Sequence, residues 1–255
     1  MCAQPVTRYA VYFAPEPTDA LWRFGSAVLG YDGASGEEVP QLVPEGFEAP
    51  AWRLLTADPR LYAFHATIKA PFRLAADQTE ETLAAALTEF AASRQRFVLP
   101  ALQVTAIADR QGGAFIALTE SKGLGSRGLA EPTPALLALE RDTVKVFEPF
   151  RAPLTDKEFA KRCPEALTER QLGHLKAYGY PHVFEDFRFH LTLTGRVPEE
   201  KVEKALNGLT KLYGEHVGQA RVPVEALALY RQTGNERFRV FARAPFAPAA
   251  GAVTG

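Results

Sequence analysis

Apolar and β-branched residues open the chain in a short run that is typical of a strand. The run RYAVYFA covers residues 8–14 and is stopped by two nearby prolines. Apolar positions then recur at helical spacing as far as Leu29, behind the candidate N-cap residues Thr18 and Asp19. Residues 30–60 are rich in Gly, Pro and Glu and follow neither period, which predicts an ordered but irregular excursion.

Beyond residue 60 one pattern of strand, helix and two strands is written twice. The first copy, residues 64–119, runs from FHATIKAPFRL through an Ala- and Leu-rich helix to two strands joined by DRQGG. The second copy, residues 189–242, runs from FHLTLTGRV through a helix to two strands joined by RQTGN. Amphipathic stretches at 134–147 and 156–177 predict helices that bridge the copies. Parts repeated in the same order predict one unit with two similar lobes across residues 1–255.

The opening strands of the two copies carry the same polar face. Alternate side chains of a strand point to one side, and in both strands that side is polar while the other is small or aliphatic. An aliphatic side suited to packing under helices makes a plain solvent-exposed edge strand a poorer explanation. The polar residues are His65, Thr67 and Lys69 in HATIK and His190, Thr192 and Thr194 in HLTLT.

Two histidines facing one cleft suit the cleavage of a phosphodiester. Imidazole titrates near neutral pH, so one ring can take a proton from the attacking water while the other gives one to the departing oxygen. Thr67 and Thr192 supply hydroxyl donors for the nonbridging phosphate oxygens, where charge develops in the transition state. Lys69 would add a positive charge on the same face. The pattern therefore predicts metal-independent acid and base catalysis by His65 and His190.

Charge and composition narrow the class of protein. The 255 residues hold 29 basic and 30 acidic side chains, a net charge of −1, so no global field would hold a nucleic acid or an anionic membrane. An apolar share of 47% and a charged share of 23% are ordinary for a globular protein. The segment MCAQPVTRYA lacks the features of a signal peptide, and no run approaches the roughly 20 apolar residues of a membrane span. A cytoplasmic protein that does not enter a membrane is expected.

A metal site would need a different pattern. His174, His182 and His190 are eight residues apart, but Gly179 and Pro181 interrupt any helix that could align them. Neither cysteine has a CxxC partner, and no carboxylate pattern of zinc type accompanies the histidines. We expect no metal and no other cofactor.

The repeated H-x-T-apolar pattern resembles the two-histidine (2H) phosphoesterase superfamily, which includes cyclic phosphodiesterases and RNA 2′,3′-cyclic-phosphate enzymes. The strings LTADPRLYAFHATIKAPFRL and GYPHVFEDFRFHLTLTGRVP look like a bacterial branch encoded beside phosphonate-degradation genes, and the resemblance extends from RYAVYFAP to near Phe246. It implies an α+β fold of two lobes related by a pseudo-twofold axis. Each lobe would hold an antiparallel sheet with helices, and the active cleft would lie between the lobes.

The resemblance also implies roles for particular residues. His65 and His190 match the catalytic histidines, and Thr67 and Thr192 match the phosphate-binding hydroxyls. Lys69 and Thr194 occupy equivalent positions but differ, which leaves open which histidine starts as the base. The first strand and the late hairpin border the site in that superfamily, so the further substrate-binding candidates are Tyr12, Tyr230 and Arg231. The implied substrate is a small cyclic phosphate or phosphodiester from phosphonate breakdown, such as ribose 1,2-cyclic phosphate or a related phosphoribosyl compound.

Two other functions use the same residues. The first is a protein that binds a phosphate ligand in the cleft without turnover. The second is an RNA end-processing enzyme that acts on 2′,3′-cyclic phosphates, which would show a cleft rimmed by several lysines or arginines. Strand propensity alone could also account for the threonines, and packing alone for Tyr12, Tyr230 and Arg231. The oligomeric state is left open.

Overall fold

The computed structural model describes residues 5–108, 112–120 and 131–248. Its strands are all antiparallel to their neighbours, in the spatial order β6-β3-β4-β5-β2-β1-β7-β8. The strands are β1 (Thr7–Phe13), β2 (Ala66–Phe72), β3 (Phe97–Ala108), β4 (Ala114–Glu120), β5 (Leu191–Thr192), β6 (Arg221–Val224), β7 (Ala226–Thr233) and β8 (Arg239–Pro245). The α-helices are α1 (Ala20–Leu29), α2 (Ala49–Leu55), α3 (Ala57–Arg60), α4 (Glu80–Ala92), α5 (Pro134–Val146), α6 (Asp156–Ala160), α7 (Glu169–Tyr178) and α8 (Glu199–His216). Short 3₁₀ turns are η1 (Glu148–Phe150), η2 (Pro164–Ala166) and η3 (Phe184–Asp186).

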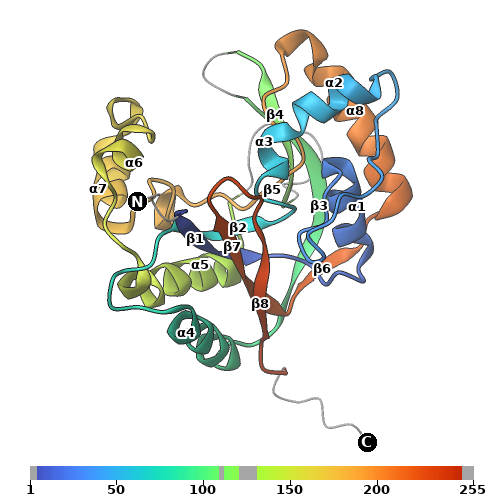
Figure 1. Ribbon diagram of the computed structural model, residues 1–255. Coiled ribbons are helices and arrows are strands. Elements are labelled where there is room, and N and C mark those ends of the chain that lie inside the picture. The colour runs from blue at the N-terminus through green and yellow to red at the C-terminus, as the bar shows by residue number, and fades with distance from the viewer. Residues whose placement is uncertain (1–4, 109–111, 121–130, 249–255) are drawn as a thin grey trace, which may run out of the picture.

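The two lobes meet at the centre of this sheet, where the opening strands of the two sequence copies, β2 and β5, lie side by side. Helices α4 to α7 gather on one side of the molecule and α1, α2, α3 and α8 on the other (Figure 1). Each lobe mixes the copies: α4 of the first copy packs on β7 and β8 of the second, and α8 of the second packs on β3 and β4 of the first. The predicted two-lobed α+β fold is confirmed, with the strands of both lobes joined in one sheet.

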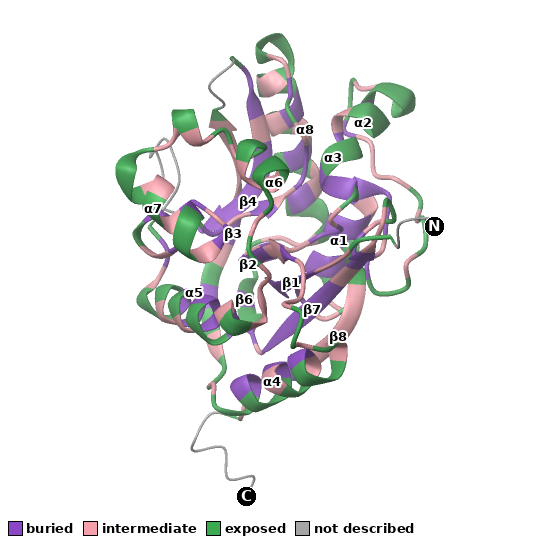
Figure 2. Cartoon of the chain, turned by 60° about the vertical axis from the view of Figure 1, so that its left-hand side comes forward, coloured by how far each residue is buried: buried purple, intermediate pink, exposed green. Residues whose placement is uncertain are grey.

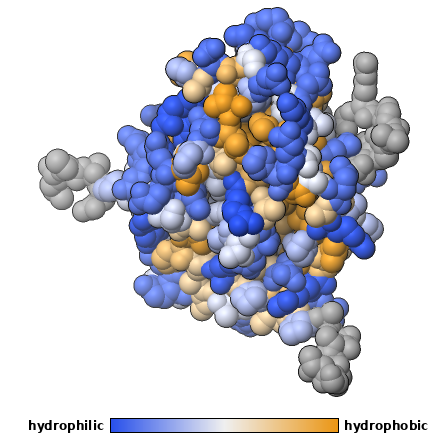
Figure 3. Space-filling view, turned by 90° about the vertical axis from the view of Figure 1, so that its right-hand side faces the viewer, coloured by the Kyte–Doolittle hydropathy of each residue, from blue (hydrophilic) through white to orange (hydrophobic). Residues whose placement is uncertain are grey.

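Buried residues follow the sheet through both lobes (Figure 2), and their apolar side chains form one large core cluster. Strands β1, β2, β4 and β7 are buried along most of their length, because helices cover the sheet and leave their own outer faces to solvent. The face that carries α1, α2 and α8 presents mostly hydrophilic side chains with apolar ones between them (Figure 3). Among the described residues, no helix is both long and apolar enough to cross a membrane.

Most predicted elements form where the local signals placed them. Helix α4 begins behind Thr79, whose hydroxyl accepts the Thr82 N–H in a capping box. Helix α1 ends at Gly30, whose φ of 71° is the left-handed conformation that glycine adopts readily. The turn DRQGG lies in part outside the described residues, which resume at Gly112.

Three segments differ from expectation, each for a local reason. The strand predicted over 189–197 shrinks to β5, because the N–H groups of Leu193 and Thr194 both bond to the carbonyl of Ile116 and the chain then turns away. The single helix predicted over 156–177 is broken into α6, η2 and α7 by Pro164, which follows Cys163 at a left-handed φ of 46°. The excursion after α1 contains α2 and α3, short helices anchored by the fully buried Trp52.

Candidate active site

The pairing of β2 with β5 brings the two H-x-T segments together. Ala66 lies opposite Leu191 in this antiparallel pair. Continued by one residue to each side, the register sets His65 opposite Thr192 and Thr67 opposite His190. Residues opposite one another share a face of the sheet, and diagonal neighbours are about 7–8 Å apart. The two histidines are such diagonal neighbours, and a tetrahedral phosphate group fits a separation of this size.

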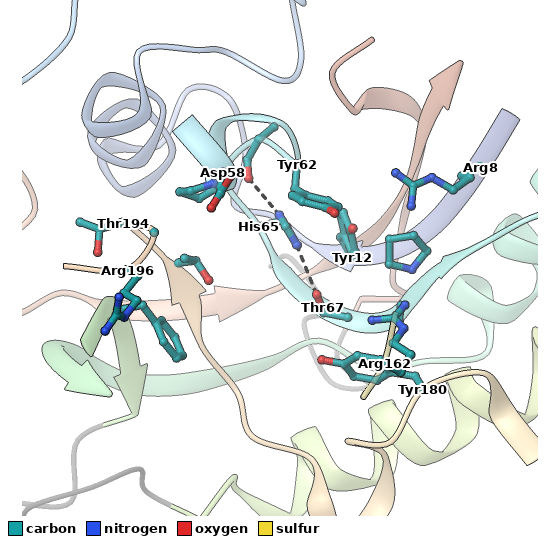
Figure 4. Close-up of a pocket in the computed structure, with 17 residues that line it drawn as sticks. Arg8, Tyr12, Asp58, Tyr62, His65, Thr67, Arg162, Tyr180, Thr194 and Arg196 are labelled. Atoms are coloured by element: carbon teal, nitrogen blue, oxygen red, sulfur yellow. Dashed lines mark hydrogen bonds between the residues drawn. The ribbon is translucent and has the colours of Figure 1, made fainter. Parts of the chain in front are cut away.

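The ring of His65 is held in one tautomer and one orientation. Its Nδ1 lies 2.9 Å from the carbonyl oxygen of Ala63, so Nδ1 carries the hydrogen and donates it. Its Nε2 lies 3.2 Å from the hydroxyl of Thr67, which donates to it (Figure 4). Tyr12 stacks on the ring with centroids 3.6 Å apart and planes 17° apart. The lone pair of Nε2 therefore points along the strand face into the site.

Burial keeps His65 neutral at physiological pH. Loss of hydration and, to a smaller extent, the nearby charge of His190 lower its pKa from 6.5 to about 4, against the opposing effect of the hydrogen bond to the Ala63 carbonyl. A neutral imidazole with its Nε2 lone pair toward the site is competent to accept a proton.

His190 repeats the same tether. Its Nδ1 donates to the carbonyl of Arg188 at 2.8 Å, again two residues earlier in the chain. Burial lowers its pKa as well, and its ring packs near Phe115 at 5.7 Å between centroids. Both histidines thus turn their Nε2 atoms away from the backbone, and both side chains are only half-buried.

Two adjoining cavities open onto these residues. A cavity of about 390 Å³ is bordered by His65, Thr67 and Thr192. A smaller one of about 240 Å³ is bordered by His190 and again by Thr67. Phe115 and Tyr180 also line both, so the two cavities meet at the H-x-T pair. The four predicted residues are brought together at one accessible site.

Of the further candidates, Tyr12 and Thr194 line the larger cavity. Thr194 is fully buried, and its hydroxyl oxygen accepts the Ile116 N–H at 2.9 Å. Tyr230 stands behind Tyr12, with ring centroids 4.9 Å apart, and is fully buried. It supports the ring that stacks on His65, and it does not line either cavity.

Lys69 does not share the polar face, and that prediction is wrong. Tyr12 lies opposite Thr67 but its neighbour Val11 lies opposite Lys69, so β2 has one extra residue at this point. The bulge turns Lys69 to the other side of the sheet. Its Nζ is buried there, 2.8 Å from the carboxylate of Glu148.

Arg231 also lies away from the site. It pairs with Tyr9 across β1 and β7, and therefore faces the side opposite to Tyr12. Its guanidinium forms an ion pair with Glu80 at 3.2 Å, at the start of α4. The expectation that Arg231 borders the cleft is wrong, because alternate residues of a strand face opposite sides and Arg231 occupies a position that faces away from the site.

Several residues of the larger cavity were not predicted. Arg8 precedes Tyr12 by four residues on β1, and strand alternation could have placed it on the same face. Arg196 follows the second motif closely, and its Nε donates to the Gly112 carbonyl at 3.1 Å. Arg162 and Tyr180 come from the bridging segment, and no sequence pattern connects them to the motif strands.

Comparison with known proteins gives one family and a few relatives. The family model described as "Protein of unknown function (DUF1045)" matches residues 67–239. A protein of Janthinobacterium sp. (strain Marseille) named ribose 1,5-bisphosphate phosphokinase PhnN is 38% identical over 192 residues, 75% of this chain and 39% of that protein. A protein of the same name from Laribacter hongkongensis (strain HLHK9) is 34% identical over 224 residues, 88% of this chain and 48% of that protein. The chain spans less than half the length of these curated relatives.

Two solved structures are similar over most of the chain but overlap weakly. E. coli LigT complexed with ATP gives a TM-score of 0.37 at 11% identity, covering 96% of this chain and 99% of LigT. The conserved protein of unknown function ATU0111 from Agrobacterium tumefaciens str. C58 gives a TM-score of 0.37 at 11% identity, covering 93% of this chain and 85% of that protein. Because both TM-scores are this low, we infer the chemistry of the site from its own residues alone.

Proposed function

The chain belongs to the DUF1045 family, and we propose that it is a metal-independent phosphoesterase that hydrolyses a small cyclic phosphate or phosphodiester. One observation carries the proposal. The pairing of Ala66 with Leu191, continued by one residue to each side, sets His65 diagonal to His190 and Thr67 diagonal to Thr192 on one accessible face, and both Nδ1 atoms are occupied by backbone carbonyls. Two rings locked with Nε2 toward one gap suit proton transfer on both sides of a phosphorus atom.

The substrate supplies the protonation state that the reaction needs. Burial lowers the pKa of both histidines, so both rings are neutral near pH 7 before a substrate binds. An anionic phosphate between them raises the pKa of an adjacent imidazole, because opposite charges favour the protonated form. The complex then holds one neutral and one protonated ring. Either histidine can fill either role on this argument.

The reaction balances with these groups alone. The neutral Nε2 takes a proton from water as the water oxygen bonds to phosphorus, and the protonated Nε2 gives its proton to the alcohol oxygen as the P–O bond breaks. The hydroxyls of Thr67 and Thr192 donate to the nonbridging oxygens. The Thr67 hydroxyl now bonds to His65 at 3.2 Å, so the substrate must take over that donor.

The donor set does not suggest a metal centre. Within the part of the chain that the structure describes, no three His, Cys, Asp or Glu side chains gather as metal ligands do. The proposed chemistry uses imidazole and hydroxyl groups, whose proton transfers need no Lewis acid.

A small ribose phosphate is the substrate class we favour. The cavity of about 390 Å³ is of the size that takes one small ligand. The resemblance to a branch encoded beside phosphonate-degradation genes points the same way, as does the ribose bisphosphate in the name of two relatives. We therefore place the reaction in phosphonate metabolism.

Hydrolysis of a panel of cyclic phosphates and diesters, with a chelator present, tests the proposal. His65→Ala and His190→Ala should each lower turnover by at least ~10². His216→Ala is the matched control, because this exposed histidine lies on α8 and borders neither cavity. Turnover in either motif variant equal to that of the control would refute the mechanism. Tight phosphate binding with no product from any substrate would favour the binding-only alternative.

A further inference from the structure

A third cavity, of about 440 Å³, adjoins the catalytic cavity of about 390 Å³. These two share Arg8, Tyr62, Pro71 and Arg162 as lining residues. The third cavity has one acidic lining residue, Glu158. Its basic lining residues are Arg8, Arg73, Arg151, Lys161 and Arg162. A chain with a net charge of −1 therefore concentrates positive charge beside its candidate active site.

Two of these five cations are neutralised by carboxylates. The guanidinium of Arg73 bonds to both oxygens of Glu158 at 3.0 Å. The Nε of Arg151 bonds to Glu148 at 2.8 Å. These ion pairs tie the walls of the cavity together and leave little charge for a ligand.

The other three cations have no carboxylate partner among the described residues. Arg8 bonds through Nε to the neutral amide oxygen of Gln232 at 2.9 Å. Arg162 lies over the ring of Tyr180 at 5.2 Å, and Lys161 makes no ion pair with any residue that the structure describes. Three uncompensated positive charges converge on one concave surface, where an anion would find charge-assisted donors.

The backbone holds two of these side chains in place. Arg8 lies on β1, in register with Gln232 of β7. Arg162 follows α6, where its N–H bonds to the Phe159 carbonyl and Cys163 turns the chain with a φ of 46°. Figure 4 shows Arg8 and Arg162 on one side of His65 and Thr67, with Thr194 and Arg196 on the other. An anion held between the two arginines would therefore lie beside the H-x-T pair and not on it.

We propose that the cavity around Arg8, Lys161 and Arg162 is a second anion subsite, and that the substrate is a small sugar phosphate carrying a phosphate monoester besides the scissile phosphate. The inference rests on the proposed function. A phosphate monoester is the best match because its three terminal oxygens can accept from two guanidinium groups and an ammonium together. A long RNA would need a track of phosphate contacts, whereas Arg8, Lys161 and Arg162 gather around one cavity, and Arg8 and Arg162 lie where it adjoins the catalytic cavity.

Matched substrate pairs test the subsite. Pentose cyclic phosphates with and without a phosphate on the terminal hydroxyl form one pair, and nucleoside 2′,3′-cyclic phosphates with and without a 5′-phosphate form another. The phosphorylated member should have a kcat/KM at least about tenfold higher. Lys161→Gln should remove about tenfold of that preference. Lys157→Gln, on the exposed face of α6 and outside the cavity, should leave it unchanged.

Binding to the His65→Ala variant separates the subsite from catalysis. A nucleoside 2′,5′-bisphosphate should bind about tenfold more tightly than the 2′-monophosphate in a calorimeter, and adding Lys161→Gln should abolish the difference. Equal affinities, or equal behaviour of the Lys161 and Lys157 variants, would overturn the subsite and leave the histidine mechanism standing. Normal turnover by His65→Ala would defeat the mechanism, while the binding data would still decide the subsite. A cyclic-phosphate-ended oligoribonucleotide preferred over every small pair would replace the sugar phosphate with RNA.

Discussion

The two halves of the site, one around His65 and one around His190, hold the imidazole ring by the same kind of hydrogen bond but differ in what packs around the ring. In both, Nδ1 donates to the carbonyl two residues earlier, at 2.9 and 2.8 Å. His65, however, stacks on Tyr12 and accepts from Thr67, and it enters a seven-residue strand paired on both sides. His190 enters a strand of two residues, and within the described part of the chain its Nε2 has no hydrogen bond to Thr192 that would match the one between His65 and Thr67.

This difference shows that the tautomer of each ring and the surroundings of each ring are set by different parts of the molecule. The local tether sets which nitrogen carries the hydrogen, and it needs only the backbone of the motif itself. The surroundings of the ring set its rigidity and its pKa, and they come from β1, β4 and the bridging segment. We therefore expect the two halves to respond alike when the imidazole is removed and differently when its neighbours are changed.

The largest expected effect is the loss of activity when both histidines are replaced. If the histidines act as one proton-transfer pair, the double variant His65→Ala/His190→Ala should lose little more activity than the worse single variant, each single loss being at least ~10². Single-turnover rates on the best substrate of the panel would measure this. Losses that multiply in the double variant would mean that the histidines act independently.

The next effect is the pH dependence of stability that comes from His65. The pKa of His65 is about 4 in the folded protein against 6.5 when unperturbed, so between these values the unfolded chain binds more protons than the native one. The contribution of His65 to the free energy of unfolding should fall by about 3 kcal/mol as the pH drops from 6.5 to 4. Below pH 4 this group should no longer change the stability with pH.

Urea unfolding of wild type and of His65→Asn at pH 7 and pH 4.5 would measure that contribution, because carboxylates common to both proteins cancel in the difference. His190→Asn serves as the matched variant for the other half. An identical loss of stability in wild type and His65→Asn would show that the ring of His65 is not held neutral.

A smaller effect should separate the threonines. Thr67→Val removes both a phosphate donor and the hydroxyl that bonds to His65, whereas Thr192→Val removes only a donor. Competitive inhibition by sulfate should weaken about tenfold in both variants, since each loses one charge-assisted hydrogen bond of about 1.5–3 kcal/mol, and only Thr67→Val should also lower turnover by freeing the ring of His65. Unchanged inhibition in both would identify the threonines as packing residues.

The smallest effect on activity concerns the positions where the motifs diverge. Lys69→Met should leave KM within about twofold of wild type, because the ammonium is bonded to Glu148 on the far side of the sheet. Thr194→Val should instead lower stability by about 1–3 kcal/mol, since the buried Ile116 N–H loses its acceptor. A large rise in KM for Lys69→Met would return that residue to the site.

Much of the fold could be predicted from local signals. The capping box at Thr79 and the left-handed glycine after α1 mark helix ends through contacts within a few residues. Strand alternation likewise put His65 and Thr67 on one face. The break in the helix at Cys163 and Pro164 could have been predicted from the sequence, since proline disfavours a continuous helix there.

The sequence by itself determined that each copy opens with an H-x-T motif and that the elements follow in a repeated order, because strand alternation and helix capping act over a few residues. Only the tertiary structure decided that His65 and His190, 125 positions apart (190 − 65), become diagonal neighbours. It also turned Lys69 away through a bulge against β1 and brought Arg8 to Arg162 around one cavity. Register, bulges and cavities depend on which distant segments pair and pack together, and no local pattern encodes that choice.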